Sequence, residues 1–411
     1  MPIYFMRGSD IIEDLIITNA RLAESGELLD IAVSEGIISQ ICPAGSKKSA
    51  GETIDACGNY ISPGFIDLHV HLRDPGLTHK EDIASGTMAA AKGGIATVCC
   101  MPNTKPCIDS PEAVRYVLTQ NANCNVLPVA AITKEQKGEE LTDFAALKRA
   151  GAIAFSDDGR PVESENVMRK ALIEAKKNDM LIMAHCEDLS MSGNESEDKI
   201  TKRDIGLACE TGAKLHICHV STKKSAGYVA RAKAGGHDIT AETCPHYFTL
   251  TNEDAAKYGA NAKMNPPLRS IEDKRGIIEA IKSGVIDIIS TDHAPHSKEE
   301  KEAGTNGITG LESSFALSVT YLVKPGHIAL GRLIELMAKN PAKRLGIDKK
   351  KGIERGKAAD LVIFDIDEKF IFDKNNSRSK SRNTPFHGFE LYGKALCTIV
   401  SGNVVYMEGL T

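Results

Sequence analysis

Short apolar runs alternate with longer amphipathic stretches from residue 63 onward. The amphipathic stretches have the spacing of helices with one buried face, and some end in paired glycines such as Gly93-Gly94, a signal of helix C-termini. The strand candidates are residues 65–72, 96–101, 126–132, 152–155, 181–184, 215–220, 238–241 and 285–290, and the helical stretches include residues 81–92, 112–119, 167–177, 226–234 and 273–282. Eight such strands, most of them followed by a helix, predict an α/β fold of the (β/α)₈ TIM-barrel type.

An open doubly wound sheet is the alternative to the barrel. It is disfavoured because no Gly-x-Gly-x-x-Gly turn follows any of the strand candidates. The two ends of the chain differ from the middle, since residues 14–43 and 357–411 read as short strands with polar turns. Neither end is long enough to hold a stable core alone. We therefore predict a barrel of residues 63–350 and a small composite β-sandwich domain formed by residues 1–62 and 351–411.

The composition is that of an ordinary globular protein, with 42% hydrophobic and 26% charged residues in a chain of 411. A formal net charge of −5 gives no electrostatic reason to expect nucleic-acid or membrane binding. No secretion signal is evident, and no apolar run approaches the roughly 20 residues of a membrane span. The eleven cysteines form no Cys-x-x-Cys pair and lie mostly in apolar runs. These features predict a cytoplasmic protein with free thiols.

Polar side chains that can bind a metal ion follow almost every strand candidate. His69 and His71 are one residue apart on a strand and share a face, and Arg73 joins them if the strand persists. Because the strand ends of a barrel converge on one face, these side chains are expected to meet in one site. The further candidates are Asn103 after the second strand, Asp157 and Asp158 after the fourth, His185 after the fifth, His219 after the sixth, Asn265 after the seventh, and Asp292 and His296 after the eighth.

Four histidines and two aspartates offer imidazole nitrogen and carboxylate oxygen, which are ligands suited to Zn²⁺. One tetrahedral ion with an open position needs fewer ligands, whereas a two-metal site would use them all. The spacing does not separate Asp157 from Asp158 as the second carboxylate.

Some neighbouring residues have an expected supporting role. Cys186 and Cys218 adjoin candidate ligands, but strand alternation predicts that they point the opposite way. His216 is interpreted as a packing residue that faces away from the site, and His293 as a residue that supports a ligand. Glu187 is either such a support or simply solvated.

Six short motifs follow one another along the chain. They read His69-Val-His71-Leu-Arg73-Asp-Pro-Gly, Met101-Pro-Asn103-Thr, Phe155-Ser-Asp-Asp158-Gly, Ala184-His185-Cys-Glu-Asp, His219-Val-Ser-Thr and Thr291-Asp292-His-Ala-Pro-His296. This set resembles the bacterial dihydroorotases of the amidohydrolase superfamily. The stretches Gly356-Lys-Ala-Ala-Asp-Leu-Val and Asn383-Thr-Pro-Phe resemble the small β domain of the same family.

The resemblance implies roles for individual residues. It implies a Zn²⁺ site with one or two ions per subunit, two being favoured, and Asp158 rather than a carboxylated lysine at the bridging position. The implied metal ligands are His69, His71, Asp158, His185, His219 and Asp292. The implied substrate contacts are Arg73, Asn103, Asn265, His296, Asn306 and Gly307.

The resemblance also implies a reaction, the reversible cyclisation of N-carbamoyl-L-aspartate to L-dihydroorotate in pyrimidine biosynthesis. In the hydrolytic direction a metal-activated hydroxide attacks the ring amide, and Asp292 passes its proton to the leaving nitrogen as general acid/base. The planar fork of Arg73 suits the substrate carboxylate. The partner is a small-molecule substrate, with a homodimer and a complex with aspartate transcarbamoylase as further expectations.

Two segments depart from the family pattern. The stretch of residues 188–203 is shorter than usual, and Thr305-Asn306-Gly307-Ile308 replaces a Pro-Phe-Gly-Ile-like substrate loop. Both departures leave open how the loops close over the substrate.

Two alternative functions remain open. One is a hydantoinase- or allantoinase-like cyclic amidohydrolase, against which Arg73 and Asp158 weigh. The other is a catalytically silent scaffold for aspartate transcarbamoylase, which missing ligands would mark, and all six are present.

Overall fold

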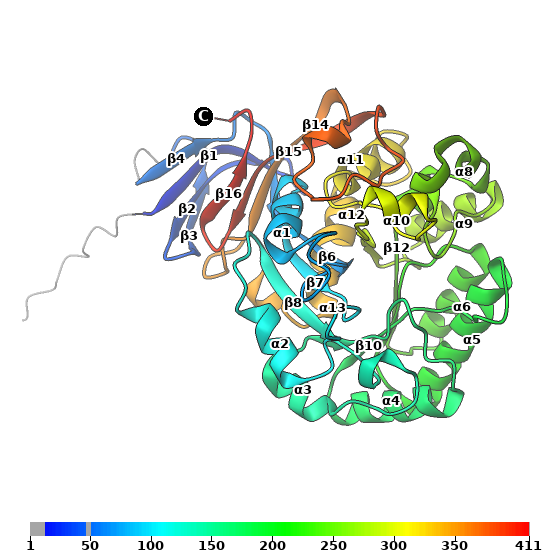
Figure 1. The fold of residues 1–411 in the computed structure, drawn as a ribbon. Coiled ribbons are helices and arrows are strands. Elements are labelled where there is room, and N and C mark those ends of the chain that lie inside the picture. Colours follow the sequence, from blue (N-terminus) through cyan, green and yellow to red (C-terminus); the bar gives the residue numbers. More distant parts are fainter. Residues whose placement is uncertain (1–12, 47–50, 411) are drawn as a thin grey trace, which may run out of the picture.

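The structure is a computed structural model that describes residues 13–46 and 51–410, and its strands divide between two sheets (Figure 1). The first twelve residues of the predicted β domain lie outside the described residues. No helix in the described ranges is long and apolar enough to cross a membrane.

One sheet is a parallel barrel whose eight strands follow one another in chain order. The barrel closes at its eighth strand, where Val70 forms a parallel bridge with His293 and the His71 amide donates to the His293 carbonyl at 2.8 Å. The strands are β6 (Phe65–Val70), β7 (Ile95–Cys100), β8 (Asn125–Ala130), β9 (Ala154–Phe155), β10 (Leu181–Ala184), β11 (Leu215–Ile217), β12 (Ile239–Thr243) and β13 (Ile288–Ile289). All eight predicted strands are present, so the barrel prediction is confirmed.

Helices surround the barrel and pack their apolar faces against its strands (Figure 1). The outer helices are α1 (Ile83–Lys92), α2 (Pro111–Leu118), α3 (Phe144–Ala150), α4 (Glu165–Lys177), α5 (Asn194–Thr211), α6 (Lys223–Ala234) and α9 (Ile271–Lys282). Short helices α7 (Pro245–Thr249), α8 (Asn252–Tyr258) and α10 (Lys298–Glu302) lie in the loops after β12 and β13. The chain then continues through α11 (Ser314–Ser318), η3 (Val319–Val323), α12 (Leu330–Ile334), η4 (Glu335–Lys339) and α13 (Asn340–Arg344).

The segment of residues 188–203, which is shorter than the family pattern, leads into the long helix α5. Several of its polar side chains are buried rather than solvated. Glu197 accepts hydrogen bonds from the amides of Ser221 and Thr222 at 3.0 and 3.1 Å. These contacts tie α5 to the loop after β11, which carries His219.

The second sheet contains strands from both ends of the chain. Its strands are β1 (Leu15–Leu22), β2 (Leu28–Ser34), β3 (Ile37–Pro43), β4 (Glu52–Asp55), β5 (Tyr60–Pro63), β14 (Leu361–Ile371), β15 (Glu390–Val400) and β16 (Asn403–Met407). The pairing of β1 with β2 is interrupted between Ile17 and Ala20, and β1 pairs with β4 before this point and with β5 after it. Side chains of the N-terminal strands and of β14 and β15 share one apolar core, which includes Ile17, Ile31 and Ile363.

Candidate metal centre

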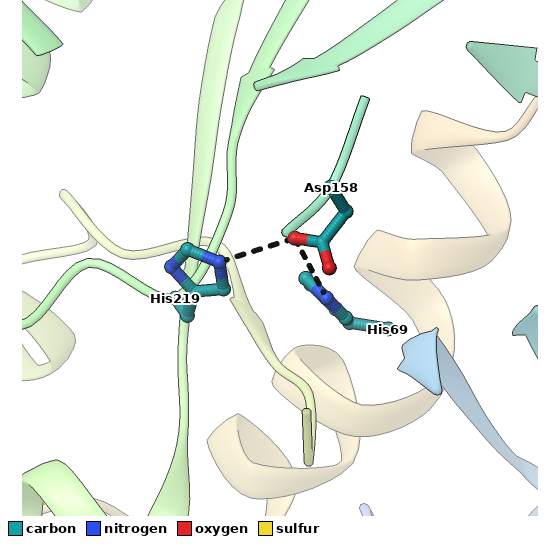
Figure 2. A group of neighbouring side chains, drawn as sticks. All are labelled: His69, Asp158 and His219. Carbon is teal, nitrogen blue, oxygen red and sulfur yellow. Dashed lines mark hydrogen bonds and ion pairs between the residues drawn. The ribbon is translucent and has the colours of Figure 1, made fainter. Parts of the chain in front are cut away.

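Asp158 lies among four histidines at the carboxyl ends of the barrel strands. Its Oδ1 is 3.2 Å from His69 Nε2, 3.2 Å from His185 Nδ1 and 3.4 Å from His219 Nε2. Its Oδ2 is 3.3 Å from His71 Nε2. Figure 2 shows His69 and His219 approaching the carboxylate from two sides. One carboxylate is therefore positioned to be shared between two pairs of imidazoles.

Asp292 approaches the same cluster from the end of the eighth strand. Its Oδ1 lies 3.1 Å from His71 Nε2 and 3.6 Å from His69 Nε2. Burial raises the pKa of this carboxyl, but the neighbouring imidazoles outweigh burial and hold the pKa below its ordinary value. The same balance, with His69 as the largest opposing cause, holds the pKa of Asp158 well below its ordinary value. Both carboxyls are thus ionised, as metal ligands must be.

The second ring nitrogen of three of these histidines is engaged by an oxygen. His69 Nδ1 donates to Glu242 Oε1 at 2.9 Å, and His71 Nδ1 donates to Asn103 Oδ1 at 2.8 Å. His185 Nε2 donates to Glu187 Oε2 at 3.1 Å. Such outer contacts fix the imidazole tautomer and leave the other nitrogen free for a metal ion.

The donor set fits a divalent metal ion. His69 Nε2 is buried and makes no hydrogen bond within the described residues. The potential ligand atoms of His69, Asp158 and His219 lie within 4.8 Å of one another, and so do those of His69, His71 and Asp292. Imidazole nitrogens and carboxylate oxygens that converge at this spacing are the ligands of zinc sites.

A cavity of about 310 Å³ opens above the cluster. Five of the six candidate ligands line it, and His69 lies behind them, fully buried. The predicted substrate contacts all line the same cavity, namely Arg73, Asn103, Asn265, His296, Asn306 and Gly307. The structure therefore brings together every site residue that the sequence suggested, while Asp157 points elsewhere, its Oδ1 accepting from the Ile132 and Thr133 amides.

Arg73 is a buried cation on the cavity wall. Its Nε donates to the Pro295 carbonyl at 3.3 Å, and its Nη2 donates to His296 Nε2 at 3.1 Å. Burial lowers the pKa of Arg73 to about 10, so the guanidinium keeps its charge at neutral pH. Burial and then Arg73 lower the pKa of His296 to about 3, so this imidazole is neutral and accepts the hydrogen bond.

One prediction about side-chain direction does not apply, and one is wrong. Strand β6 ends at Val70, and Arg73 has a left-handed backbone with φ of 59°, so strand alternation does not place its side chain. Cys218 does not point away from the site, since its thiol lies within 4.8 Å of the ligand atoms of His69 and Glu242. The reason is the left-handed backbone of His219, whose φ of 35° breaks the alternation.

Glu242 is the important residue that the sequence analysis missed. It is fully buried in β12 and accepts from His69, while His216 Nε2 lies 3.1 Å from its other oxygen. Burial raises the pKa of Glu242, but hydrogen bonds from His216 and His69 hold it far below its ordinary value. The available signal was a carboxylate directly after the predicted strand of residues 238–241. His216 therefore supports His69 through Glu242 rather than only packing.

The structure also defines the contacts of Glu187 and His293. Glu187 supports His185 and also accepts from Asn265 Nδ2 at 2.9 Å, so it is not simply solvated. His293 is buried, and its Nδ1 accepts from the Gly310 amide at 3.2 Å, which fixes the turn after the eighth strand.

Comparison with known proteins gives consistent matches along the chain. The family described as dihydro-orotase-like matches residues 58–199, and the amidohydrolase family matches residues 229–406. A dihydroorotase of Acetivibrio thermocellus is 43% identical and covers 98% of this chain and 99% of its own length. A dihydroorotase of Ruminiclostridium cellulolyticum is 46% identical and covers 92% of this chain and 94% of its own length.

Solved structures share the fold at lower identity. The L-hydantoinase (dihydropyrimidinase) of Arthrobacter aurescens superposes with a TM-score of 0.90 at 28% identity, covering 97% of both chains. The dihydropyrimidinase of Brevibacillus agri superposes with a TM-score of 0.86 at 22% identity, covering 95% of both chains, which supports the fold alone.

Proposed function

The chain belongs to the dihydroorotase family of the amidohydrolase superfamily and performs this family's reaction, and we propose how its own side chains perform it. The reaction interconverts N-carbamoyl-L-aspartate and L-dihydroorotate by forming or breaking the ring amide bond. The observation that carries the proposal is a cluster of six ligand-type side chains, five of which line the cavity, beside a buried arginine on the cavity wall.

We propose two metal positions that share Asp158. His69, His71 and Asp292 would hold one ion, and His185 and His219 the other. Zn²⁺ is favoured because the proposed ligands are imidazoles and carboxylates. When bound, the two ions supply Lewis acidity, which lowers the pKa of water and polarises an amide carbonyl.

Asp292 would carry the proton in both directions. Its carboxylate faces the cavity and is ionised in the structure, so it can accept a proton from the attacking water. During hydrolysis the water oxygen bonds to the ring carbonyl carbon, the carbon–nitrogen bond breaks, and Asp292 returns the proton to the leaving nitrogen. Cyclisation runs through the same steps in reverse.

Arg73 would bind the carboxylate that both substrates retain. The guanidinium is held by Pro295 and His296, which fixes the plane of its donors before substrate arrives. A fixed planar fork recognises a carboxylate through two parallel hydrogen bonds. Asn103 and Asn265 already support His71 and Glu187, and we propose that they offer their remaining polar atoms to the substrate amide groups.

The test is an assay of both directions with the Asp292→Asn variant. The unmodified protein should cyclise carbamoyl-aspartate and hydrolyse dihydroorotate faster than an unsubstituted hydantoin, which has no carboxylate. Asp292→Asn should lower kcat by roughly 10² to 10⁴, the usual range for general acid/base groups. Asp188→Asn is a suitable control, because Asp188 pairs with Lys199 outside the cavity.

Faster turnover of the hydantoin would favour the hydantoinase alternative, and a near-normal kcat in Asp292→Asn would show that another residue moves the proton. The homodimer and the complex with aspartate transcarbamoylase stay predictions, which light scattering of the protein with and without the transcarbamoylase can test.

A further inference from the structure

Lys301 is the only buried lysine among the described residues, with 4% of its surface exposed. It lies on α10, in the loop after the eighth strand. Its Nζ donates to three main-chain carbonyls, those of Lys263 at 3.0 Å, Thr305 at 2.7 Å and Gly307 at 2.7 Å. The three N–H groups of one ammonium are thereby matched by three acceptors. No carboxylate in the described part of the chain forms an ion pair with it, so its contacts are made to backbone alone.

The three carbonyls belong to two loops that carry proposed substrate contacts. Lys263 precedes Asn265 by two residues, and Thr305 and Gly307 flank Asn306, whose side chain lines the cavity. The Gly307 amide donates to the Lys263 carbonyl at 3.0 Å, which joins the two loops directly. The ammonium therefore lies at the junction of the two loops.

Gly307 is held from a second direction by Asn383 of the C-terminal segment. Asn383 Nδ2 donates to the Gly307 and Ala294 carbonyls at 3.0 Å each, and its Oδ1 accepts from the His296 amide at 3.2 Å. Gly307 itself has φ of 130°, and a Cβ there would lie 2.8 Å from the Ala294 carbonyl oxygen. The loop backbone is thus fixed in one place next to His296.

A buried ammonium is costly unless polar groups replace its water shell. Burial lowers the pKa of Lys301 to about 8, with the nearby charge of Lys263 as a smaller cause. A methionine or leucine at this position would fill the same space without that cost, so the amino group has a use beyond packing. Two of its three contacts order the backbone beside Asn306, and the third holds the loop that leads to Asn265.

We propose that Lys301 is a positioning residue for substrate binding, whose ammonium holds the Thr305–Gly307 loop against the turn that carries Asn265. The proposal rests on the proposed function of the cavity. Lys301 touches none of the proposed metal ligands, so its role is separable from metal binding.

The test compares Lys301→Met with Lys298→Met on the same helix. Lys298 is exposed, and its Nζ forms an ion pair with Glu302 Oε1 at 3.8 Å. The Lys298→Met variant therefore controls for loss of a positive charge from α10. Lys301→Met should raise KM for dihydroorotate about tenfold or more, the loss expected for hydrogen bonds to a charged group. Metal content should be unchanged, and kcat should change much less than KM. Amide hydrogen exchange in the peptide spanning residues 303–309 should become faster.

An unchanged KM together with unchanged exchange in residues 303–309 would overturn the proposal. The proposal would also be overturned if Lys298→Met raised KM as much as Lys301→Met does. A fall in kcat together with loss of bound metal in Lys301→Met would overturn it as well. Lys301→Gln, which keeps an amide donor, serves if the methionine variant does not fold. The exchange measurement needs no substrate, so it tests the hold of Lys301 on the loop even if dihydroorotate is not turned over.

Discussion

Asp157 and Asp158 are adjacent carboxylates with separate contacts. Asp158 Oδ1 and Oδ2 face the four histidines, whereas Asp157 Oδ1 accepts from the amides of Ile132 and Thr133 at 2.8 and 3.1 Å. A left-handed Gly159 follows this pair, which turns the chain out of the barrel. The structure thus separates two residues that spacing alone left equivalent.

We expect Asp158→Asn to lose bound metal and activity while the fold is kept. Asp157→Asn should retain metal but lower the free energy of unfolding by about 1–3 kcal/mol, the cost of disturbing buried hydrogen bonds. Metal analysis and denaturant unfolding of both variants check this. Loss of metal in Asp157→Asn, with metal retained in Asp158→Asn, would mean that the two roles are exchanged.

His296 gives a prediction about pH. Its folded-state pKa is lowered to about 3 by burial and Arg73, whereas an unfolded histidine takes up its proton near pH 6.5. The unfolded state therefore binds more protons between these values, and the stability that His296 contributes is lost as the pH falls below about 6.5. In His296→Gln that loss should be absent.

Urea unfolding at pH 7.5 and pH 5.5 measures the difference. Between pH 7.5 and pH 5.5 the free energy of unfolding should fall by about 1 kcal/mol more in the unmodified protein than in His296→Gln. The reason is that a proton bound only by the unfolded state lowers this free energy by about 1.4 kcal/mol per pH unit. If the free energy of unfolding fell equally in both proteins, the imidazole of His296 would be charged in the folded state at pH 5.5. It could then not accept a hydrogen bond from Arg73.

Elements of the barrel were predictable because most of its strands are apolar runs followed by an amphipathic helix. Strands β7 and β10 match the runs that predicted them to within a residue at each end. The helix predicted for residues 81–92 begins at Ile83, since Asp82 caps it by accepting from the Ser85 amide at 2.7 Å. The local pattern of apolar and polar residues is enough to predict an element where burial of one face decides its conformation.

The direction of side chains beyond the strand ends was not predictable from the same pattern. Arg73, His219 and Asp292 have φ of 59°, 35° and 48°, which residues with side chains seldom adopt. Strand alternation holds only while the pleat persists, so it fails at the positions where the chain turns to present these groups. Backbone strain of this kind concentrates at functional sites.

Long-range support was not predicted from the local sequence pattern. Glu242 belongs to no local motif, and its importance comes from contacts with His69 and His216 on other strands. Asn383 was noticed only for its resemblance to a small β domain, yet its amide holds the loops after the eighth barrel strand. Such contacts join residues far apart in the chain and leave no periodic signal.

At the scale of the whole molecule, the C-terminal segment joins the second sheet to the mouth of the barrel. Glu81, at the start of the α1 region, is buried and accepts a hydrogen bond from Ser379, while Asn383 reaches the backbone of His296. Strand β15 packs on α11, and Thr398 donates to the Ala91 carbonyl of α1 at 2.6 Å. The barrel site is therefore built partly by residues from the far end of the chain.

Metal removal should affect both activity and the stability of the whole fold. The proposed ligands come from five barrel strands, so bound ions link strands that are distant in sequence, and the unfolded chain lacks this arrangement. A ligand that binds only the folded state at 100 times its Kd stabilises it by about 2.7 kcal/mol. Chelator-treated protein should therefore lose activity and melt several degrees lower, and added Zn²⁺ should restore both. Asp158→Asn is the matched control, since its melting temperature should respond little to Zn²⁺. Full activity and an unchanged melting temperature in metal-free protein would contradict the metal centre itself.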